Sequence, residues 1–202
     1  MPQTSTDIGK LERTRLKLLD AVRNEIAESG RFTAERVASR AGSSTPTFYN
    51  HFANKDAALT AAYELLMGDL VQTVAQKCRI EVLLDKGLRE LAAWWIETTA
   101  AFFRQNAPLF RLAQAAIKES KPMRAVFRAH EEEIIQLYLR FIERGQAAQL
   151  IRRGDARAMA EVLTITAQSW NHPLVQRLQP GSALHHELIE TVVRMLQPDE
   201  SR

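Results

Sequence analysis

The sequence contains very little cysteine and no long run of apolar residues. Only one of its 202 residues is a cysteine, Cys78, so the chain cannot close an internal disulfide, and no zinc-type spacing of Cys and His occurs. The longest apolar run covers about five residues, 92–96, whereas a membrane-spanning helix needs roughly 18. No signal-like apolar stretch follows the first charges. We therefore expect a cytoplasmic protein with no membrane partner.

Motifs of the common enzyme classes are missing as well. The chain has no phosphate-binding loop, G-x-S-x-G elbow, paired-histidine helix or paired-carboxylate spacing, and the glutamates after His130 are better interpreted as a solvated face. His172, His185 and His186 are candidates for a metal site, although exposed histidines near a C-terminus are commoner. Cys78 is a candidate redox sensor, although a single buried thiol is usually inert. We expect no enzyme, no cofactor and no metal.

The excess of positive charge is small. The formal net charge is +3, which favours a polyanionic partner only weakly. The stretch 31–55 holds four basic residues and one acidic residue, so it can account for the whole excess. The position of the charge is therefore more informative than its total.

Apolar residues recur every three or four positions in nearly every long segment, and no segment alternates with period two for long enough to form a strand. This pattern predicts an all-α fold of about nine helices. The predicted helices cover about 10–29, 33–40, 44–52, 54–78, 87–104, 109–117, 123–145, 155–171 and 183–196, with breaks at Pro173 and Pro180–Gly181. We expect a DNA-binding domain over 1–55 and a ligand-binding and dimerisation domain over 56–202.

Three of these helices have apolar stripes that we expect to face the core. In the first helix the stripe is Leu11, Leu18, Leu19, Val22 and Ile26. In the last two helices the stripes are Met159, Val162, Leu163, Thr166 and Trp170, and then Leu184, Leu188, Ile189, Val192 and Leu196. The flanks of the last two stripes are rich in Ala and Thr, so each helix has room for a second contact face.

Two short predicted helices are joined by a turn that contains Gly42. This is the geometry that places a second helix in the major groove of DNA. Thr33 and Ser44 are suited to cap the two helices, and Pro46 is tolerated because it falls in a first turn. Hydroxyl and amide side chains dominate the exposed positions of the second helix, and these are Ser43, Ser44, Thr45, Thr47, Tyr49, Asn50 and His51.

The residues from Arg40 to Leu59 resemble the signature of the TetR family of bacterial transcriptional regulators. An Ala–Gly turn leads to a Thr–aromatic–Tyr–x–x–Phe helix, and Asn–Lys–Asp then begins the next helix. The resemblance covers about a quarter of the chain, and its motifs recur in register. The alternative is that Phe48, Tyr49 and Phe52 form an ordinary aromatic stripe and that the serines are only caps and turns.

The resemblance implies a role for each residue of this segment. Thr47, Tyr49, His51 and Lys55 would hold the DNA backbone, with Thr33 and Arg40 helping from the preceding helix. Ser44, Thr45 and Pro46 would face bases, while Asn50 is an exposed neighbour in the same helix. Phe48 and Phe52 would be core residues. Ser43 stays open between a polar core residue and a DNA contact.

The resemblance also implies a homodimer and an effector site in the body of the molecule. The dimer would form through helices at about 155–171 and 183–196 and bind a palindromic double-stranded operator, whereas a monomeric core is the simpler alternative. Abundant aromatic residues suggest a hydrophobic or aromatic small-molecule effector. The candidate lining residues are Trp94, Trp95, Phe102, Phe103, Phe110, Met123, Phe127, Tyr138 and Trp170, with Asn106, Gln114, His130 and Gln168 as polar members.

We therefore expect a repressor that an effector releases from DNA by favouring another conformation of the dimer. Activation is an alternative, because whether such a regulator represses or activates depends on where its operator lies relative to a promoter. A DNA-binding or protein-interaction regulator without a ligand is a second alternative. A helical ligand-binding bundle without DNA is a third.

Overall fold

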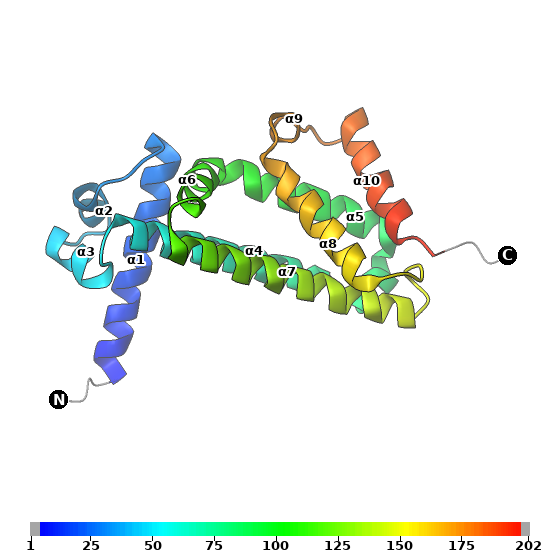
Figure 1. Cartoon of the computed structure of the whole chain (residues 1–202), viewed down its shortest axis with the longest axis horizontal. Coiled ribbons are helices and arrows are strands. Elements are labelled where there is room, and N and C mark those ends of the chain that lie inside the picture. The colour runs from blue at the N-terminus through cyan, green and yellow to red at the C-terminus, as the bar shows by residue number, and fades with distance from the viewer. Residues whose placement is uncertain (1–4, 199–202) are drawn as a thin grey trace. The chain divides into compact units, whose positions relative to one another are not determined.

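A computed structural model describes residues 5–198 of the chain, and within this range all regular structure is helical. The prediction of an all-α fold is confirmed. The elements shown in Figure 1 are α1 (Ser5–Ser29), α2 (Ala34–Arg40), α3 (Thr45–His51), α4 (Lys55–Lys77), α5 (Ile80–Gln105), α6 (Ala107–Ile117), α7 (Lys121–Ala147), α8 (Ala156–Gln168), the 3-10 helix η1 (Ser169–Asn171), α9 (Pro173–Gln176) and α10 (Ala183–Leu196). Among these described helices, none has the length and apolar character needed to cross a bilayer.

Two helical segments were not predicted. Residues 80–86 are helical and are separated from the rest of α5 by Gly87, whose φ is +77°; the prediction began this helix at Gly87. Pro173 was expected to break the chain, but it begins α9, with His172 as the N-cap. Proline is tolerated there because the first amides of a helix have no intrahelical acceptor.

The chain forms two compact units. Unit 1 comprises Met1–Leu66 and Asn106–Phe127, and unit 2 comprises Met67–Gln105 and Arg128–Arg202. Unit 1 thus contains the whole of the predicted DNA-binding segment. It also contains the first half of α4 and all of α6. The division of function at residue 55 stays a prediction.

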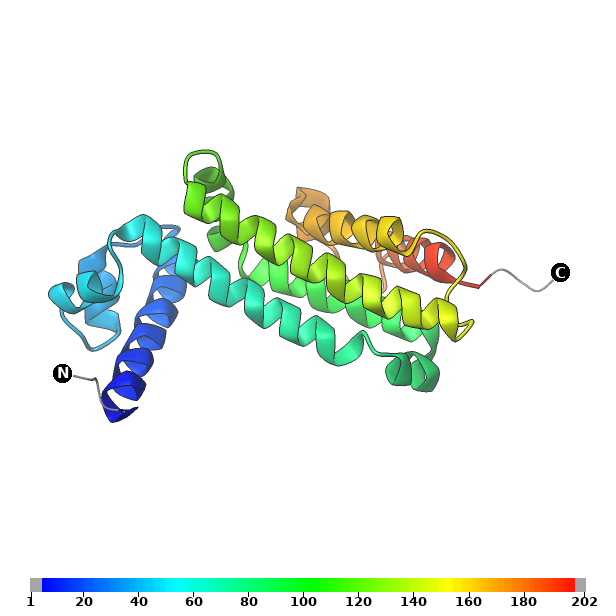
Figure 2. The same cartoon turned by 60° about the horizontal axis from the view of Figure 1, so that its bottom comes forward.

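The core of unit 1 gathers around the second half of α1. Leu18, Val22 and Ile26 are completely buried; α2 packs against α1, and α3 packs against α2 (Figure 2). The part of α1 before Arg15 projects past α2 and α3. Leu11 is accordingly 47% exposed, so the prediction that it joins the core stripe is wrong.

The core of unit 2 is aromatic. Trp95, Tyr138 and Trp170 are each at least 96% buried, and the indole of Trp95 donates a hydrogen bond of 2.8 Å to the Tyr138 hydroxyl. Val162 on α8 and Leu184 on α10 were predicted to face the core, but they are 46% and 42% exposed. The reason is that α8 and α10 each bury one face and leave a second apolar face open.

Candidate nucleic-acid interface

The turn between α2 and α3 is built by two backbone hydrogen bonds. The Ser43 N–H donates to the Ala38 carbonyl at 2.8 Å, and the Gly42 N–H donates to the Ser39 carbonyl at 3.1 Å. This pair of bonds closes a helix with a left-handed residue at its end, and Gly42 supplies it with a φ of +63°. The prediction that Gly42 forms the turn is therefore confirmed.

Local polar contacts organise the first turn of α3. The Ser44 hydroxyl accepts from the Thr47 N–H at 3.3 Å and lies 2.8 Å from the Thr47 hydroxyl. Pro46 occupies a first-turn position, where its missing N–H costs nothing. This cap fixes where α3 begins, and the Ser44 and Thr47 hydroxyls both lie near the N-terminal end of the helix.

Aromatic packing orients α3 about its own axis. Phe48 is completely buried and Phe52 is 3% exposed, and their ring centroids lie 5.2 Å apart. Tyr49 stands at 88° to the Phe48 ring and is 49% exposed. With Phe48 and Phe52 turned into the core, as predicted, Tyr49 and Asn50 are left on the exposed side.

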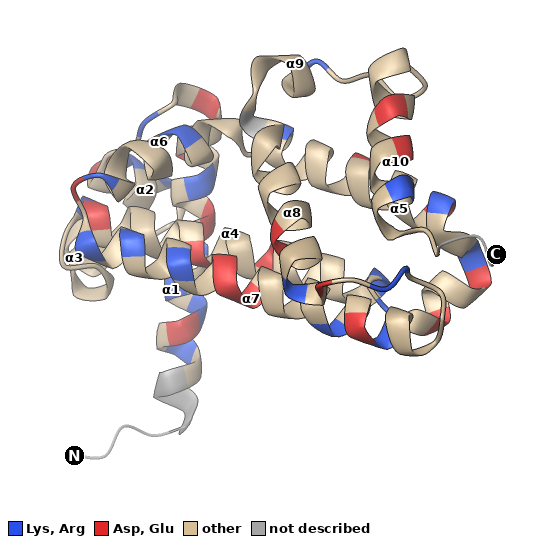
Figure 3. Cartoon of the chain, turned by 45° about the vertical axis from the view of Figure 1, so that its right-hand side comes forward, with Lys and Arg blue, Asp and Glu red and all other residues tan. Residues whose placement is uncertain are grey.

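The predicted DNA-contact residues therefore gather on α3 and the segments that flank it. Thr33, Arg40, Ser44, Pro46, Tyr49, Asn50 and Lys55 are exposed, while Ser43, Thr45, Thr47 and His51 are half-buried. The half-buried state of Ser43 does not decide between its two interpretations. No Lys, Arg, Asp or Glu lies on α3, and basic and acidic residues are interspersed along α1 and α7 (Figure 3).

Thr33 and Lys55 lie at the starts of the flanking helices. The Thr33 hydroxyl accepts from the Arg36 N–H at 3.3 Å and so caps α2. The Lys55 ammonium lies 5.8 Å from the centroid of the Phe32 ring, which is 8% exposed. This distance is within the range of a cation–π interaction. Phe32 was missed by the sequence interpretation, although it directly precedes the predicted cap.

Arg40 is held by two carboxylates of α1. Its Nε donates to Glu25 at 2.8 Å, and its two terminal nitrogens bind Glu28. Glu25 is 3% exposed and also lies 2.6 Å from the Nε of Arg36. Arg40 was predicted as a DNA contact; the structure gives it a second role, as a link between α1 and α2.

Glu25 is the residue of this network that the sequence interpretation missed. It lies three positions after Val22 and one before Ile26, within the apolar stripe of α1. A carboxylate at a core-facing position is rarely buried unless it is paired. That rule was the available signal, and the arginines of the next helix were the nearest partners.

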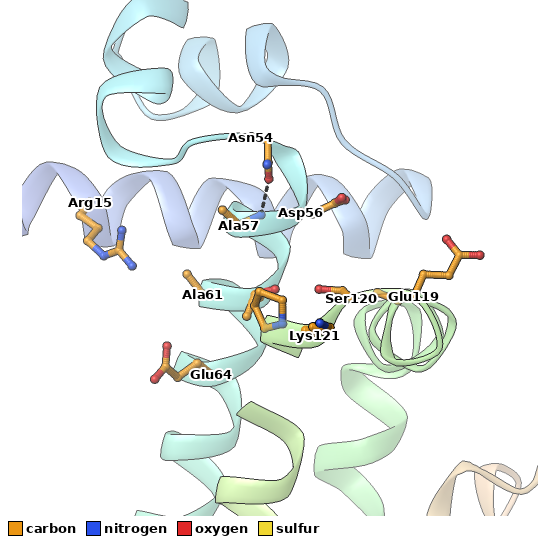
Figure 4. Close-up of a pocket in the computed structure, with 12 residues that line it drawn as sticks. Arg15, Asn54, Asp56, Ala57, Ala61, Glu64, Glu119, Ser120 and Lys121 are labelled. Carbon is orange, nitrogen blue, oxygen red and sulfur yellow. Dashed lines mark hydrogen bonds between the residues drawn. The ribbon is translucent and has the colours of Figure 1, made fainter. Parts of the chain in front are cut away.

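A cleft of about 610 Å³ lies in unit 1 beside the first turns of α4. Figure 4 shows Asn54 capping the Ala57 N–H, with Arg15 and Glu64 on one side of the cleft. On its other side, the turn between α6 and α7 contributes Glu119 and Ser120, and the first residue of α7 is Lys121. The cleft has walls of mixed charge.

The residues predicted to line an effector site are divided between the units. In unit 2, Trp95, Phe103, Tyr138 and Trp170 are buried, and Trp94, Phe102 and His130 are half-buried; Gln168 is exposed and donates to Glu131. In unit 1, Phe110 and Met123 are buried, Asn106 and Phe127 are half-buried, and Gln114 is exposed. The apolar cavity beside Trp95 and Tyr138 in unit 2 measures only about 30 Å³.

The structure defines the surroundings of His185, a candidate metal ligand, and of Cys78, a candidate redox sensor. His185 was expected to be exposed, but it is 6% exposed: its Nδ1 accepts from the Gly181 N–H, and its Nε2 lies 3.3 Å from a Glu97 carboxylate oxygen. No group of three or more His, Cys, Asp or Glu suited to a metal occurs within residues 5–198. Burial raises the pKa of the Cys78 thiol to about 12, so it is protonated at neutral pH.

Comparisons with known proteins place these features in a family. Residues 18–62 match the family model described as bacterial regulatory proteins, tetR family. No curated protein matches the sequence. Solved structures match the fold across nearly the whole chain.

One such structure, from Mesorhizobium loti MAFF303099, is described as a TetR-family transcriptional regulator. It is 18% identical, with a TM-score of 0.72 over 96% of this chain and 100% of its own. A complex of SmeT with triclosan is 21% identical, with a TM-score of 0.69 over 93% of both chains. NalD from Pseudomonas aeruginosa is 19% identical, with a TM-score of 0.61 over 94% of this chain and 100% of its own. Residues 18–62, which contain the helix-turn-helix, thus match the TetR family of bacterial regulatory proteins, and the fold of the chain is that of solved TetR-family regulators.

Proposed function

We propose that the chain is a homodimeric repressor that binds operator DNA through α3 and releases it when a hydrophobic or aromatic molecule binds unit 2. The match of residues 18–62 to the tetR family model supports a DNA-binding transcriptional regulator. NalD is a secondary repressor of the MexAB-OprM multidrug efflux pump, which favours repression here.

The exposed face of α3 carries the proposal for DNA binding. Tyr49 is half exposed over a fully buried Phe48, so the helix presents its polar side with little freedom to rotate. We assign Thr47, Tyr49, His51 and Lys55 to the DNA backbone. The residues at the start of the helix, Ser44, Thr45 and Pro46, are assigned to base edges, because the N-terminal residues of a recognition helix contact them.

A salt-dependent gel shift on the DNA upstream of the gene tests this assignment. Affinity that falls linearly with salt on logarithmic axes indicates phosphate contacts. Lys55→Ala should reduce the salt slope by about 1 and weaken binding to all DNA sequences alike, whereas Thr45→Ala should change which sequence is preferred. Lys77→Ala is the matched control, since it removes an exposed lysine from unit 2. Equal slopes for the Lys55 and Lys77 variants would contradict the assignment.

The open apolar faces of α8 and α10 carry the proposal for dimerisation. Val162 and Ile165 on α8 are 46% and 66% exposed, and Leu184 on α10 is 42% exposed, with Leu188 and Met195 half-buried on the same helix. Exposed apolar faces of this kind are typical of a contact surface. A second copy is the occupant we propose, because two-fold pairing supplies two recognition helices to a palindromic site.

Sedimentation of matched variants tests the dimer. Ile165→Glu should convert dimer to monomer and weaken operator binding. Leu84→Glu is the control: Leu84 is 65% exposed, about as much as Ile165, but lies on α5 outside the α8–α10 faces. A monomeric wild-type protein that still binds its operator tightly would overturn the dimer proposal.

The aromatic core of unit 2 carries the proposal for the effector. The buried indole N–H of Trp170 has no hydrogen-bond acceptor in the described structure. An unpaired buried donor costs about 1–3 kcal/mol, which a ligand with an acceptor atom would relieve. The cavity that Trp95 and Tyr138 line measures about 30 Å³, far below the roughly 300 Å³ of a ligand site, so binding requires side chains of the core to move.

Tryptophan fluorescence tests the effector site, because all three tryptophans, Trp94, Trp95 and Trp170, lie in unit 2. Triclosan is a suitable first probe, since SmeT forms a complex with it. Titration should change the emission and release operator DNA at the same concentrations, and Trp170→Phe should weaken both responses. If a panel of hydrophobic compounds produces neither response, the regulator acts without a ligand.

A further inference from the structure

Arg15 makes two contacts with the end of the recognition helix, although it lies on α1. Its guanidinium donates to the carbonyl of His51 at 3.2 Å. The same group lies over the Phe52 ring, with Cζ 4.9 Å from the ring centroid. Arg15 and His51 are 36 residues apart and both are half-buried. This contact joins α1 directly to the last turn of α3.

The last turn of a helix needs such a contact. The final carbonyls of α3 have no intrahelical donors, and a cation near them is favourable. His51 is the last residue of the helix, and Phe52 is its C-cap. A planar guanidinium suits this place, because it can donate in its plane and stack on an aromatic ring with its face.

The other supports of α3 leave its last turn less constrained. Ser44 and Thr47 fix the first turn, and Phe48 anchors the middle. Beyond these, Phe52 packs on Phe48, and its N–H donates to the Phe48 carbonyl at 3.0 Å. Arg15 is the charged group that ties this end to another helix.

We infer that Arg15 is a positioning residue for DNA recognition: it fixes the last turn of α3 so that Tyr49 and His51 face the DNA backbone. The inference rests on the proposed function of α3. Arg15 also lines the cleft beside α4 (Figure 4). Its action on DNA is indirect, through the backbone of His51 and the ring of Phe52.

Operator affinity and its salt slope distinguish positioning from direct contact with phosphate. Arg15→Ala should weaken binding to the upstream DNA about tenfold, as expected for loss of a charged hydrogen bond. The salt slope should stay unchanged, whereas loss of a phosphate contact would lower it by about 1. Affinity for a random-sequence duplex should fall much less than affinity for the operator.

Arg13→Ala is the matched control. Arg13 is an exposed arginine of the same helix whose Nε donates only locally, to the Gly9 carbonyl at 3.0 Å. Its removal takes away the same charge without touching α3, so operator affinity should stay within about twofold of wild type. Arg15→Lys keeps a cation and one donor, and it should recover most of the loss.

Three outcomes would overturn the inference: equal affinities for the Arg15→Ala and Arg13→Ala variants, a slope lowered by about 1, or no recovery by Arg15→Lys. If Arg15→Ala melts below the assay temperature, Arg15→Gln replaces it and should lose less affinity, because it keeps an N–H donor. Failure of the wild-type protein to bind any upstream DNA would instead refute the proposed function.

Discussion

In unit 1 the first turn of the recognition helix is organised by bonds between near neighbours in the chain, and a distant residue, Arg15, contacts only its last turn, whereas unit 2 holds its aromatic core through contacts between distant residues. Ser44 caps Thr47 three positions later. In unit 2, Trp95 donates to Tyr138, 43 residues away, and its ring lies 6.1 Å from that of Trp170. Local bonds fix a surface that a short sequence motif can encode. A core assembled from distant segments has no such motif, and its function depends on how tightly it packs.

The strongest test of this difference is Phe48→Ala. Phe48 is fully buried and contacts the rings of Tyr49 and Phe52, so its loss should cost about 3–5 kcal/mol of stability. Urea unfolding should show the loss, and a gel shift should show no operator binding. Tryptophan emission, which reports on unit 2, should keep its folded value at low urea. Retained operator binding would show that α3 does not depend on this anchor.

The buried carboxylate of unit 1 should give the next largest effect. Glu25→Gln puts an amide against Arg36 and Arg40, and we expect it to cost about 1–3 kcal/mol. The cost is below that of a fully buried ion pair, because both arginines are partly exposed. Glu28→Gln is the control: Glu28 binds the same Arg40 but is exposed, so its loss should destabilise the protein less than the loss of Glu25. Thermal melting of both variants measures the difference.

How well each feature could be predicted depends on how far apart in the sequence its bonded residues lie. The caps at Ser44, Asp155 and Ser182 could be predicted because each accepts an N–H three residues later. The Gly42 turn could be predicted for the same reason. The helical break at Gly87 and the short helix that begins at Pro173 were missed, because Gly87 was interpreted as the start of a helix and Pro173 as a break in the chain.

The candidate DNA site was predictable as a set of residues but not as a network. The α3 residues follow from a local pattern, whereas the pairing of Arg40 with Glu25 and Glu28 requires α1 to pack against α2. Arg15 was missed because its partner lies 36 residues later. Similarly, the exposure of Val162 depends on what covers α8, which periodicity does not specify.

Removing one helix cap in each unit compares their local stability directly. The Ser44 hydroxyl accepts from the Thr47 N–H, and the Asp155 carboxylate accepts from the Ala158 N–H. Each change to alanine should cost about 1 kcal/mol, measured by urea unfolding. Only Ser44→Ala should alter operator preference, as measured by selection from a randomised duplex pool. An equal shift in preference for Asp155→Ala would show that the two units do not divide their functions in this way.

Acid should produce the smallest effect, and it should act on both units. Hydrogen bonds from Arg40 hold the pKa of Glu28 below its usual value of 4.5, and hydrogen bonds from Arg157 do the same for Glu132 in unit 2. A carboxyl group whose pKa is lower in the folded state stabilises the fold above its unfolded pKa, and this contribution is lost as pH falls through the folded pKa.

Melting temperature should therefore drop more steeply below about pH 4.5 for wild type than for Glu28→Gln or Glu132→Gln. Both carboxylates are exposed, so salt should shrink the difference. Similar responses of the two variants would mean that surface ion pairs contribute alike in both units. The contrast between the units would then reside in their interiors, in the buried Glu25 of one and the aromatic core of the other. A much larger response for Glu28→Gln would instead tie the Glu28–Arg40 pair to the buried Glu25, making that network one cooperative element.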